Sequence, residues 1–215
     1  MQITTLSADY GVHFNTVLFP FSIIEVVSSL EKIGYDISPD IPFPRPIGRF
    51  IGSGEIARKG KVAIQVEGGE KLLAVAGVSL SSAIDSFNEF AKALNEDHKI
   101  DVIPLVRFYR IGANYEIASN SNTLKKIANI AKVPLLANFG TILGQEVVST
   151  ELKFGAKDLE PNSENWLDVS IRPNYERADR YIISIVYRNI DKAKTQAFTD
   201  HIEENIIKIV ESVDR

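Results

Sequence analysis

The sequence predicts an α+β fold with a mostly antiparallel sheet and with helices packed on one face. Strand-like and helix-like segments come in runs and do not alternate regularly, which favours an antiparallel sheet over a doubly wound one. Gly-Gly and Lys-Gly turns join neighbouring strand segments as hairpins. The order strand, helix, three strands, helix occurs twice, which predicts internal duplication of a β-α-β-β-β-α unit. The halves are residues 1–98 and 99–215, with one continuous domain as the alternative.

The first half opens with a strand and a helix. Residues 13–19 are rich in β-branched and aromatic side chains, which predicts a strand that ends at Pro20. Ser22 is a suitable N-cap for a helix over residues 23–33, where apolar residues recur at helical spacing. Residues 38–46 contain four prolines. They predict a rigid extended connector, with a polyproline-type docking segment as the alternative.

Three strands and a second helix complete the first half. The strands are predicted over residues 47–58, 61–67 and 72–78, and the middle one alternates strictly between apolar and polar side chains. Residues 79–82 supply caps for a helix that extends to Leu94.

The second half repeats this order with a long strand, a short helix, three strands and a terminal helix. The predicted segments are residues 100–117, 123–131, 142–154, 166–172, 181–188 and 192–213. Pro134 marks the end of the short helix, and the strand over 142–154 is expected to bulge near Gly144. In the terminal helix, the spacing of 4, 4 and 3 predicts a buried stripe of Phe198, Ile202, Ile206 and Ile209.

This order of elements is similar to that of duplicated folds such as the TATA-box-binding protein, in which one curved sheet carries its helices on one side. The similarity is one of topology, because the chain contains no motif of that family. A shared fold does not by itself give a function.

Composition predicts a soluble cytoplasmic protein. The apolar fraction is 45% and there is no cysteine, so disulfides, thiolate metal sites and cysteine nucleophiles are excluded. The first residues resemble no signal peptide, and no apolar run has the ~20 residues that span a bilayer. The formal net charge is −4 and neither half has an excess of Lys and Arg, so tight nucleic-acid binding is not expected.

No motif indicates catalysis, a metal or a cofactor. The histidines, His13, His98 and His201, fall in three different segments and do not form a metal-ligand pattern. Residues 52–55 read Gly-Ser-Gly-Glu, which lacks the third glycine of a dinucleotide site, so a strand bulge is the better interpretation. These observations favour a protein that is not an enzyme and uses no cofactor.

The strands near the C-terminus provide the best candidate surface. Alternation places Leu167, Val169 and Ile171 towards the core, so the intervening residues point away from it. The surface so predicted, with contributions from the long strand, comprises Trp166, Asp168, Arg172, Arg110, Asn114 and Glu116. Three interpretations are open: a solvated face with ion pairs, an oligomer contact, and a site for a ligand or partner.

A basic cluster lies in the same region. Its members are Arg172, Arg177, Arg180 and Arg188, and the acidic residues Glu176 and Asp179 lie among them. The mixture of charges favours a salt-bridged turn over a phosphate site.

The sequence therefore leads to one main functional hypothesis and two alternatives. The main hypothesis is a non-enzymatic binding or assembly protein, self-associating as a homodimer, that uses an exposed sheet face. One alternative is a small-ligand sensor or enzyme with a pocket between the halves, and the other is a nucleic-acid-binding subunit of a larger complex. The sequence does not identify the ligand, substrate or partner.

Overall fold

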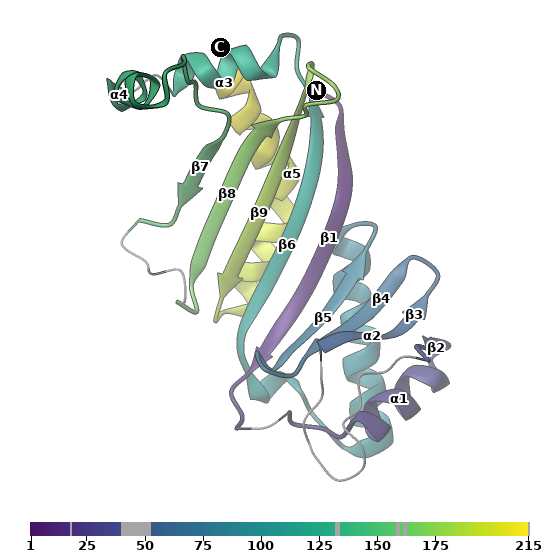
Figure 1. Ribbon diagram of the computed structural model, residues 1–215. Helices are drawn as coiled ribbons and strands as arrows, with labels where there is room; N and C mark the ends of the chain where they lie inside the picture. The colour runs from purple at the N-terminus through teal and green to yellow at the C-terminus, as the bar shows by residue number, and fades with distance from the viewer. Residues whose placement is uncertain (18, 40–52, 132–133, 158–159, 161–162, 215) are drawn as a thin grey trace.

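A single open sheet of nine antiparallel strands runs through the described part of the computed structural model (Figure 1). The structure describes residues 1–17, 19–39, 53–131, 134–157, 160 and 163–214. The strand order is β2-β3-β4-β5-β1-β6-β9-β8-β7. The predicted α+β class with an antiparallel sheet is therefore confirmed.

The elements follow one another along the chain in two series. The first series is β1 (Ile3–Phe14), α1 (Ile23–Lys32), β2 (Asp36–Ile37), β3 (Ser53–Lys59), β4 (Val62–Glu67), β5 (Leu72–Gly77) and α2 (Leu80–His98). After one short 3-10 turn, Ile103–Leu105, the second series is β6 (Val106–Ala118), α3 (Thr123–Ile130), α4 (Pro134–Leu143), β7 (Leu152–Gly155), β8 (Trp166–Pro173), β9 (Arg180–Asn189) and α5 (Lys192–Asp214).

The two longest strands, β1 and β6, pair at the centre of the sheet. Their register extends from Ile3 opposite Ile117 to Phe14 opposite Val106, with shifts near each end. The remaining strands extend outwards on either side, β5-β4-β3-β2 beyond β1 and β9-β8-β7 beyond β6. In each series the first strand pairs with the last of the later strands. The two series differ from the predicted β-α-β-β-β-α unit, because the first has one further strand, β2, and the second has one further helix, α4.

The helices α2 and α5 cover one face of the sheet (Figure 1). The helix α2 packs on β1 and β5, where the Tyr10 and Phe87 rings meet edge to face with centroids 5.2 Å apart. The helix α5 packs on β6 and β9, where Tyr187 and Phe198 stack with centroids 4.0 Å apart. We call the opposite face, which carries no helix among the described residues, the open face.

Two Ser residues begin the helices of the first series as predicted. The Ser22 side chain accepts a hydrogen bond from the Glu25 amide, and the Glu25 carboxylate accepts one from the Ser22 amide at 2.7 Å. Ser79 and Ser82 form the equivalent reciprocal pair at the start of α2. These caps satisfy amides that would otherwise have no partner in the first helical turn.

The alternation predicted for the C-terminal strands is confirmed. Val169 and Ile171 of β8 are buried in the core, as are Tyr181, Ile183 and Ile185 of β9. Because side chains alternate along a strand, the intervening residues of β8 and β9 lie on the open face.

The predicted strand over residues 13–19 is wrong in extent, since β1 spans Ile3–Phe14. Its buried residues are Ala8, Tyr10, Val12 and Phe14, and polar or small residues alternate with them. A strand with only one apolar face and several Ser, Asp and Gly residues has weak β-propensity, which explains why residues 3–12 escaped prediction.

The predicted strand over residues 142–154 is also wrong. Residues 134–143 form α4, and only Leu152–Gly155 form a strand. Pro134 begins this helix and does not merely end the preceding one, because proline at the first helical position sacrifices no hydrogen bond.

Two predictions fall wholly or partly outside the described residues. Most of the proline-rich connector lies outside the described residues. So do residues 47–52 of the strand predicted over 47–58, and the described part of that strand belongs to β3. A bulge lies one residue beyond the expected stretch 52–55, because the register of β3 on β4 shifts between Glu55 and Ala57 and skips Ile56.

The buried stripe of α5 differs in part from the prediction. Ile202 and Ile206 are buried as expected, and Val210 and Val213 continue the stripe towards the C-terminus. Phe198 and Ile209 are half-buried at its border. The spacing of 4, 4 and 3 from Ile202 keeps the stripe on one side of the helix.

Replacing Ile206, which is 1% exposed, by alanine should lower the free energy of unfolding by about 2–5 kcal/mol, because the cavity left in the core is closed only in part. Urea unfolding followed by circular dichroism measures this change. Glu203→Ala on the exposed side of α5 is the control and should leave the midpoint unchanged. Equal midpoints for the two variants would mean that α5 is not docked as described.

Candidate functional site

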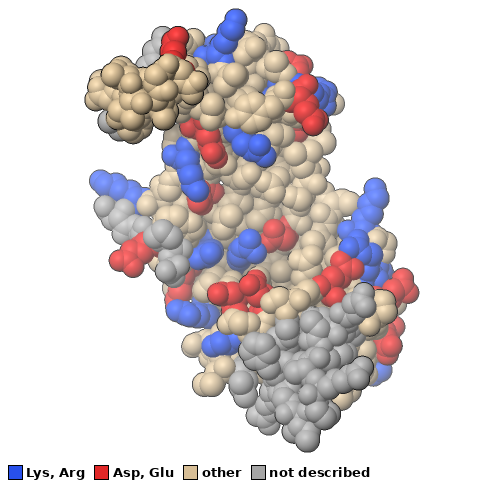
Figure 2. Space-filling model, viewed as in Figure 1, with Lys and Arg blue, Asp and Glu red and all other residues tan. Residues whose placement is uncertain are grey.

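Two adjoining hollows lie on the open face, over the strands on either side of β1. The larger has a volume of about 730 Å³ and is lined by His13 of β1, Phe108 and Arg110 of β6, and Arg188 of β9. The smaller, of about 420 Å³, extends towards β3 and β4 and includes Gln65. Arg110, Glu67 and Leu72 line both hollows. The lining residues therefore come from both series of elements, and Figure 2 shows acidic and basic side chains close together across this face.

Small residues on the central strands let larger side chains cross the open face beside these hollows. Gly11 of β1 lies opposite Ala74 of β5, and Gly112 of β6 lies opposite Asp9 of β1. A side-chain carbon on Gly11 would come within 2.8 Å of the Leu72 side chain. One on Gly112 would overlap the Asp9 carboxylate. Glycine at these two positions therefore lets Leu72 and Asp9 lie across the sheet.

Asp9 and Arg110 form an ion pair at the boundary between the hollows. Asp9 Oδ2 lies 3.3 Å from Arg110 Nη1. The side chain of Asp9 is 30% exposed and that of Arg110 is 28% exposed. Burial raises the pKa of the Asp9 carboxyl, and the charge of Arg110 opposes this rise without cancelling it. The pair is therefore partly desolvated. The charge of each group is stabilised by its local partners more than the charge of a fully hydrated surface group would be.

Arg110 and Arg188 are directly opposite each other in the pairing of β6 with β9. Both side chains line the larger hollow. Burial lowers the pKa of Arg188, and the neighbouring charge of Arg110 lowers it further. The Arg188 guanidinium also lies 5.8 Å from the centre of the Phe108 ring, a distance typical of a cation–π contact. Phe108 therefore helps to fix where this guanidinium lies.

His13 forms the other side of the larger hollow. Its ring stacks on Phe108 with centroids 4.1 Å apart, and its Nδ1 lies 3.1 Å from the Glu70 carbonyl oxygen. A carbonyl only accepts, so Nδ1 must donate and Nε2 then carries the lone pair. Burial lowers the pKa of His13 to about 4, with Arg188 and Arg110 acting in the same direction. The ring is therefore neutral at pH 7 and offers an acceptor.

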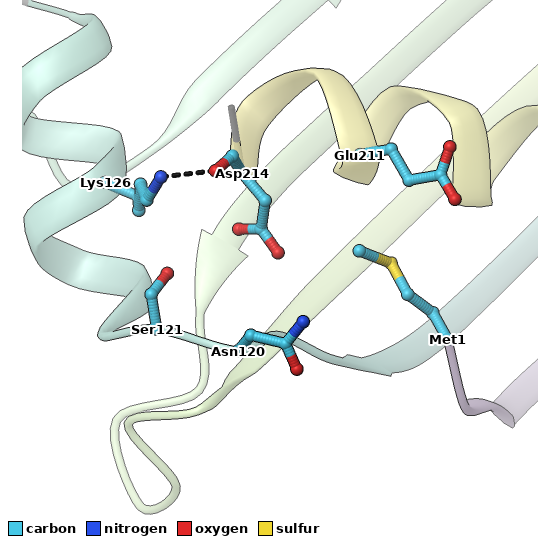
Figure 3. Close-up of a pocket in the computed structure, with 6 residues that line it drawn as sticks. All are labelled: Met1, Asn120, Ser121, Lys126, Glu211 and Asp214. Carbon is cyan, nitrogen blue, oxygen red and sulfur yellow. Dashed lines mark hydrogen bonds between the residues drawn. The ribbon is translucent and has the colours of Figure 1, made fainter.

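A third hollow, of about 300 Å³, lies where the chain ends meet α3 (Figure 3). Its main acidic group, Asp214, already accepts hydrogen bonds of 2.9 Å from Ser119 and Tyr181. Lys126 donates to the Asp214 backbone oxygen. These contacts attach the end of α5 to the sheet and to α3, so we assign this hollow a structural role.

The structure distributes the six predicted surface residues along the open face. Trp166 lies opposite Arg188, which lies opposite Arg110, so these three form one row across β8, β9 and β6. Asp168 lies in the next row and forms an ion pair with Lys153 at 3.2 Å. Of the predicted set, Arg110 lines the hollows.

The other three members lie farther along the strands. Asn114 donates to Ser7 at 2.8 Å and accepts from Ser184 at 2.5 Å, so its amide links three strands. Arg172 is exposed, and it lies two strands away from Glu116, with Ile182 between them.

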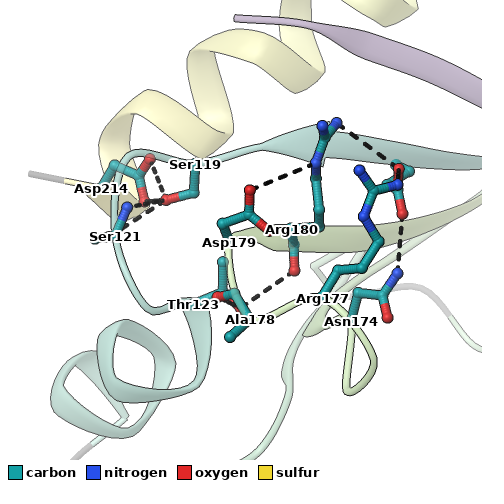
Figure 4. Close-up of polar contacts among 10 residues, drawn as sticks. Ser119, Ser121, Thr123, Asn174, Arg177, Ala178, Asp179, Arg180 and Asp214 are labelled. Atoms are coloured by element: carbon teal, nitrogen blue, oxygen red, sulfur yellow. Dashed lines mark hydrogen bonds and ion pairs between the residues drawn. The ribbon is translucent and has the colours of Figure 1, made fainter.

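Glu116 belongs to a buried polar network, and so does much of the predicted basic cluster. The Glu116 carboxylate accepts from Asn174 at 2.9 Å and from Arg177 at 3.1 Å, and Arg180 lies 3.7 Å away. Figure 4 shows the last three on the turn between β8 and β9 and the start of β9. The predicted salt bridge within the turn is present between Arg180 and Asp179 at 3.9 Å, whereas Arg177 pairs with Glu116 of β6 and Arg188 lies apart in the larger hollow.

Sequence reasoning missed Asp9 and His13 as parts of a site. Both lie on β1, of which Asp9 falls in the part that was not predicted as a strand and His13 was predicted as the first residue of the strand. The useful signal is the alternation from Ala8 to Phe14, in which every second residue is apolar and the others are Asp, Gly and His. This pattern places Asp9 and His13 on the face opposite the core.

The described residues offer no group of three or more His, Asp or Glu arranged to hold a metal ion. No helix among them is both long enough and apolar enough to cross a membrane. No protein-family model matches the sequence, and no curated protein is significantly similar to it. The function must therefore be argued from the site itself.

The low pKa of His13 makes stability depend on pH. The folded-state pKa of about 4 lies below the ordinary 6.5, so the unfolded chain binds a proton first as the pH falls. Stability from this group is complete above about pH 6.5 and is lost towards pH 4. Between pH 7 and pH 5, the free energy of unfolding should fall by about 1 kcal/mol more in the wild type than in His13→Gln. This value is already reduced for the partial exposure of the ring.

Urea unfolding of both proteins at the two pH values tests this prediction. Contributions from Asp9, Glu70 and the other titrating groups are present in both proteins and cancel in the difference. An equal loss of stability in the two would show that His13 titrates normally.

Proposed function

We propose that the protein is a non-enzymatic binding protein that takes a small ligand in the larger hollow of the open face. The observation that carries this proposal is the convergence of Arg110, Arg188 and His13 around one hollow of the open face. Concave sites with a few converging polar groups, at the junction of two structural units, are where small ligands usually bind. The proposal thus combines the expected sheet-face binding with the expected pocket between the halves.

Binding is favoured over catalysis by the state of the two titrating groups. A general base works best when its pKa lies near the working pH. Burial lowers the pKa of His13 to about 4, which makes its free nitrogen a weak base and a good hydrogen-bond acceptor. Asp9 is held against Arg110, which favours a role in positioning that side chain.

We also propose that residues 1–98 and 99–215 are two copies of one unit. The shared pairing order and the placement of α2 and α5 on the same face support this proposal. The larger hollow would then lie at the junction of the two copies, beside the central pair β1 and β6. Superposition of the two halves in an experimental structure tests the idea, and a poor match of the equivalent strands would contradict it.

A ligand panel tests the binding function. Nucleotides, sugar phosphates, amino acids and organic acids are added separately to the protein, and thermal unfolding is followed by fluorescence. We expect at least one compound to raise the midpoint in a concentration-dependent way, because a ligand that binds only the folded state stabilises it.

Gly69→Trp and Arg110→Ala locate any such effect. The first adds a bulky ring to the lining of the larger hollow, at a position where a side-chain carbon meets no neighbour within 4 Å, and the second removes a charged group from the same lining. Stabilisation that persists in both folded variants would place binding elsewhere. A panel without any stabilising compound would contradict the proposed function.

Self-association through α4 is a second candidate function. Its side chains Phe139, Ile142 and Leu143 are 44%, 77% and 62% exposed. The helix contains no charged residue, and Figure 2 shows it as an uncharged lobe at one end of the molecule. An uncharged apolar surface is complementary to itself, and two-fold dimers are the commonest oligomers. We therefore propose a second copy of the chain as the partner.

Ile142→Glu should shift the protein from dimer to monomer, because it would bury an unpaired charge in the contact. Sedimentation velocity over a hundredfold range of concentration measures the shift. Ile24→Glu, at a position on α1 that is 75% exposed, is the matched control and should leave the dimer intact. A wild-type protein that stays monomeric throughout would rule out this contact.

A further inference from the structure

We infer that the ligand of the larger hollow carries an anionic group, a carboxylate or a phosphate, which Arg110 and Arg188 bind together. This inference rests on the proposed binding function and adds the chemical class of the ligand. Three features of the hollow support it.

The first feature is the register of the two arginines. They occupy directly opposed positions on β6 and β9, and both side chains line the same hollow. Like charges at opposed positions destabilise an antiparallel pair. An anion between the two guanidinium groups would turn this repulsion into attraction. Arginine is also suited to the task, because its planar group can bind two oxygens of one carboxylate or phosphate.

The second feature is that both guanidinium groups are placed and that Arg110 still has donors to offer. Arg110 contacts Asp9 through Nη1 at 3.3 Å, and a guanidinium carries five N–H donors, so donors remain for a ligand. Arg188 is placed by its contact with the Phe108 ring. Because both groups are held before binding, little conformational entropy is lost when an anion arrives.

The third feature is the balance of charge around the hollow. The chain as a whole has a formal charge of −4, yet the larger hollow is lined by four basic and two acidic residues. These are Lys71, Arg107, Arg110 and Arg188 against Glu67 and Glu70. Arg107 and Arg110 are each paired with a carboxylate outside this lining, Glu164 and Asp9 respectively, so the positive excess around the hollow is smaller than this count. The excess that remains on the lining itself favours anions over cations.

His13 adds a constraint on the rest of the ligand. Its Nδ1 donates to the Glu70 carbonyl, which leaves Nε2 as an acceptor at the side of the hollow. A hydroxyl or amine near the anionic group could donate to this nitrogen. We therefore expect hydroxy acids, amino acids or phosphate monoesters to bind better than simple anions.

Titrations with potassium phosphate and potassium malonate test the inference. Ionic strength is kept constant with potassium chloride, and binding is followed by the amide NMR signals of Leu72 and Phe108, which line the hollow. The fluorescence of Trp166, the one tryptophan of the chain, gives a second signal from the same row. We expect saturable changes with at least one of the two anions.

The variants Arg110→Ala and Arg188→Ala should each weaken this binding at least about tenfold, since each loses charge-assisted hydrogen bonds. The lysine variants should fall between wild type and alanine, because they keep the charge and lose the two-pronged contact. Arg172→Ala removes an exposed arginine from the same face and should bind like wild type. Circular dichroism establishes that each variant is folded.

The outcomes separate the two sources of the anionic group. Saturation by phosphate alone assigns a phosphate ester, saturation by malonate alone assigns a carboxylate, and either result supports the inference. Absence of saturation by both anions, or equal weakening by Arg172→Ala and Arg110→Ala, would overturn it. A panel compound that binds in the hollow without needing either arginine would overturn this inference while leaving the proposed function intact.

Discussion

The pairing of β1 with β6 is the constraint on which the rest of the structure depends. This pair joins the two series of elements and is the longest in the sheet. Because side chains alternate along a strand, one register places Tyr10 and Tyr115 in the core and Asp9 and Arg110 on the open face. A slip by one residue would exchange the two faces. The core and the candidate site are therefore specified by the same set of backbone hydrogen bonds.

The two faces of the central strands meet different physical demands. On the helix side, large side chains such as Phe87 and Ile111 fill the space between sheet and helices. On the open face, Gly11 and Gly112 leave room for the side chains of Leu72 and Asp9 to lie over the strands. The same strands thus supply a densely packed core and, a side-chain length away, a hollow lined by charged groups. Rigid strands hold those groups more firmly than loops would.

Elements with a strong periodic pattern could be predicted from the sequence. The caps at Ser22 and Ser79 located two helices, and the alternation of residues 166–172 and 181–188 gave the correct faces of two strands. The first part of β1 and the helix α4 were missed, for opposite reasons. The first has too few apolar residues for a strand pattern, whereas α4 is apolar and contains β-branched residues without packing into the core.

The candidate site was less accessible to sequence reasoning than the fold. Arg110 and Arg188 are 78 positions apart, and only the pairing of β6 with β9 brings them together. The six residues predicted for the surface do share the face defined by alternation, but Glu116 and Asn114 are engaged in contacts that hold the strands together. Alternation predicts which face a side chain occupies. It does not predict which neighbours it meets across strands that are distant in the chain.

The central position of the N-terminal strand also bears on how the chain folds during synthesis. The first series can complete the pairings of β1 with β5 and of β5 with β4 by itself, but the other edge of β1 receives β6, which ends at Ala118. Until that residue has left the ribosome, β1 presents an unpaired edge, which is a template for association with other nascent chains. Contacts between segments so distant in sequence also form slowly. The strand that is most central in the finished protein is therefore the one exposed longest while it is being made.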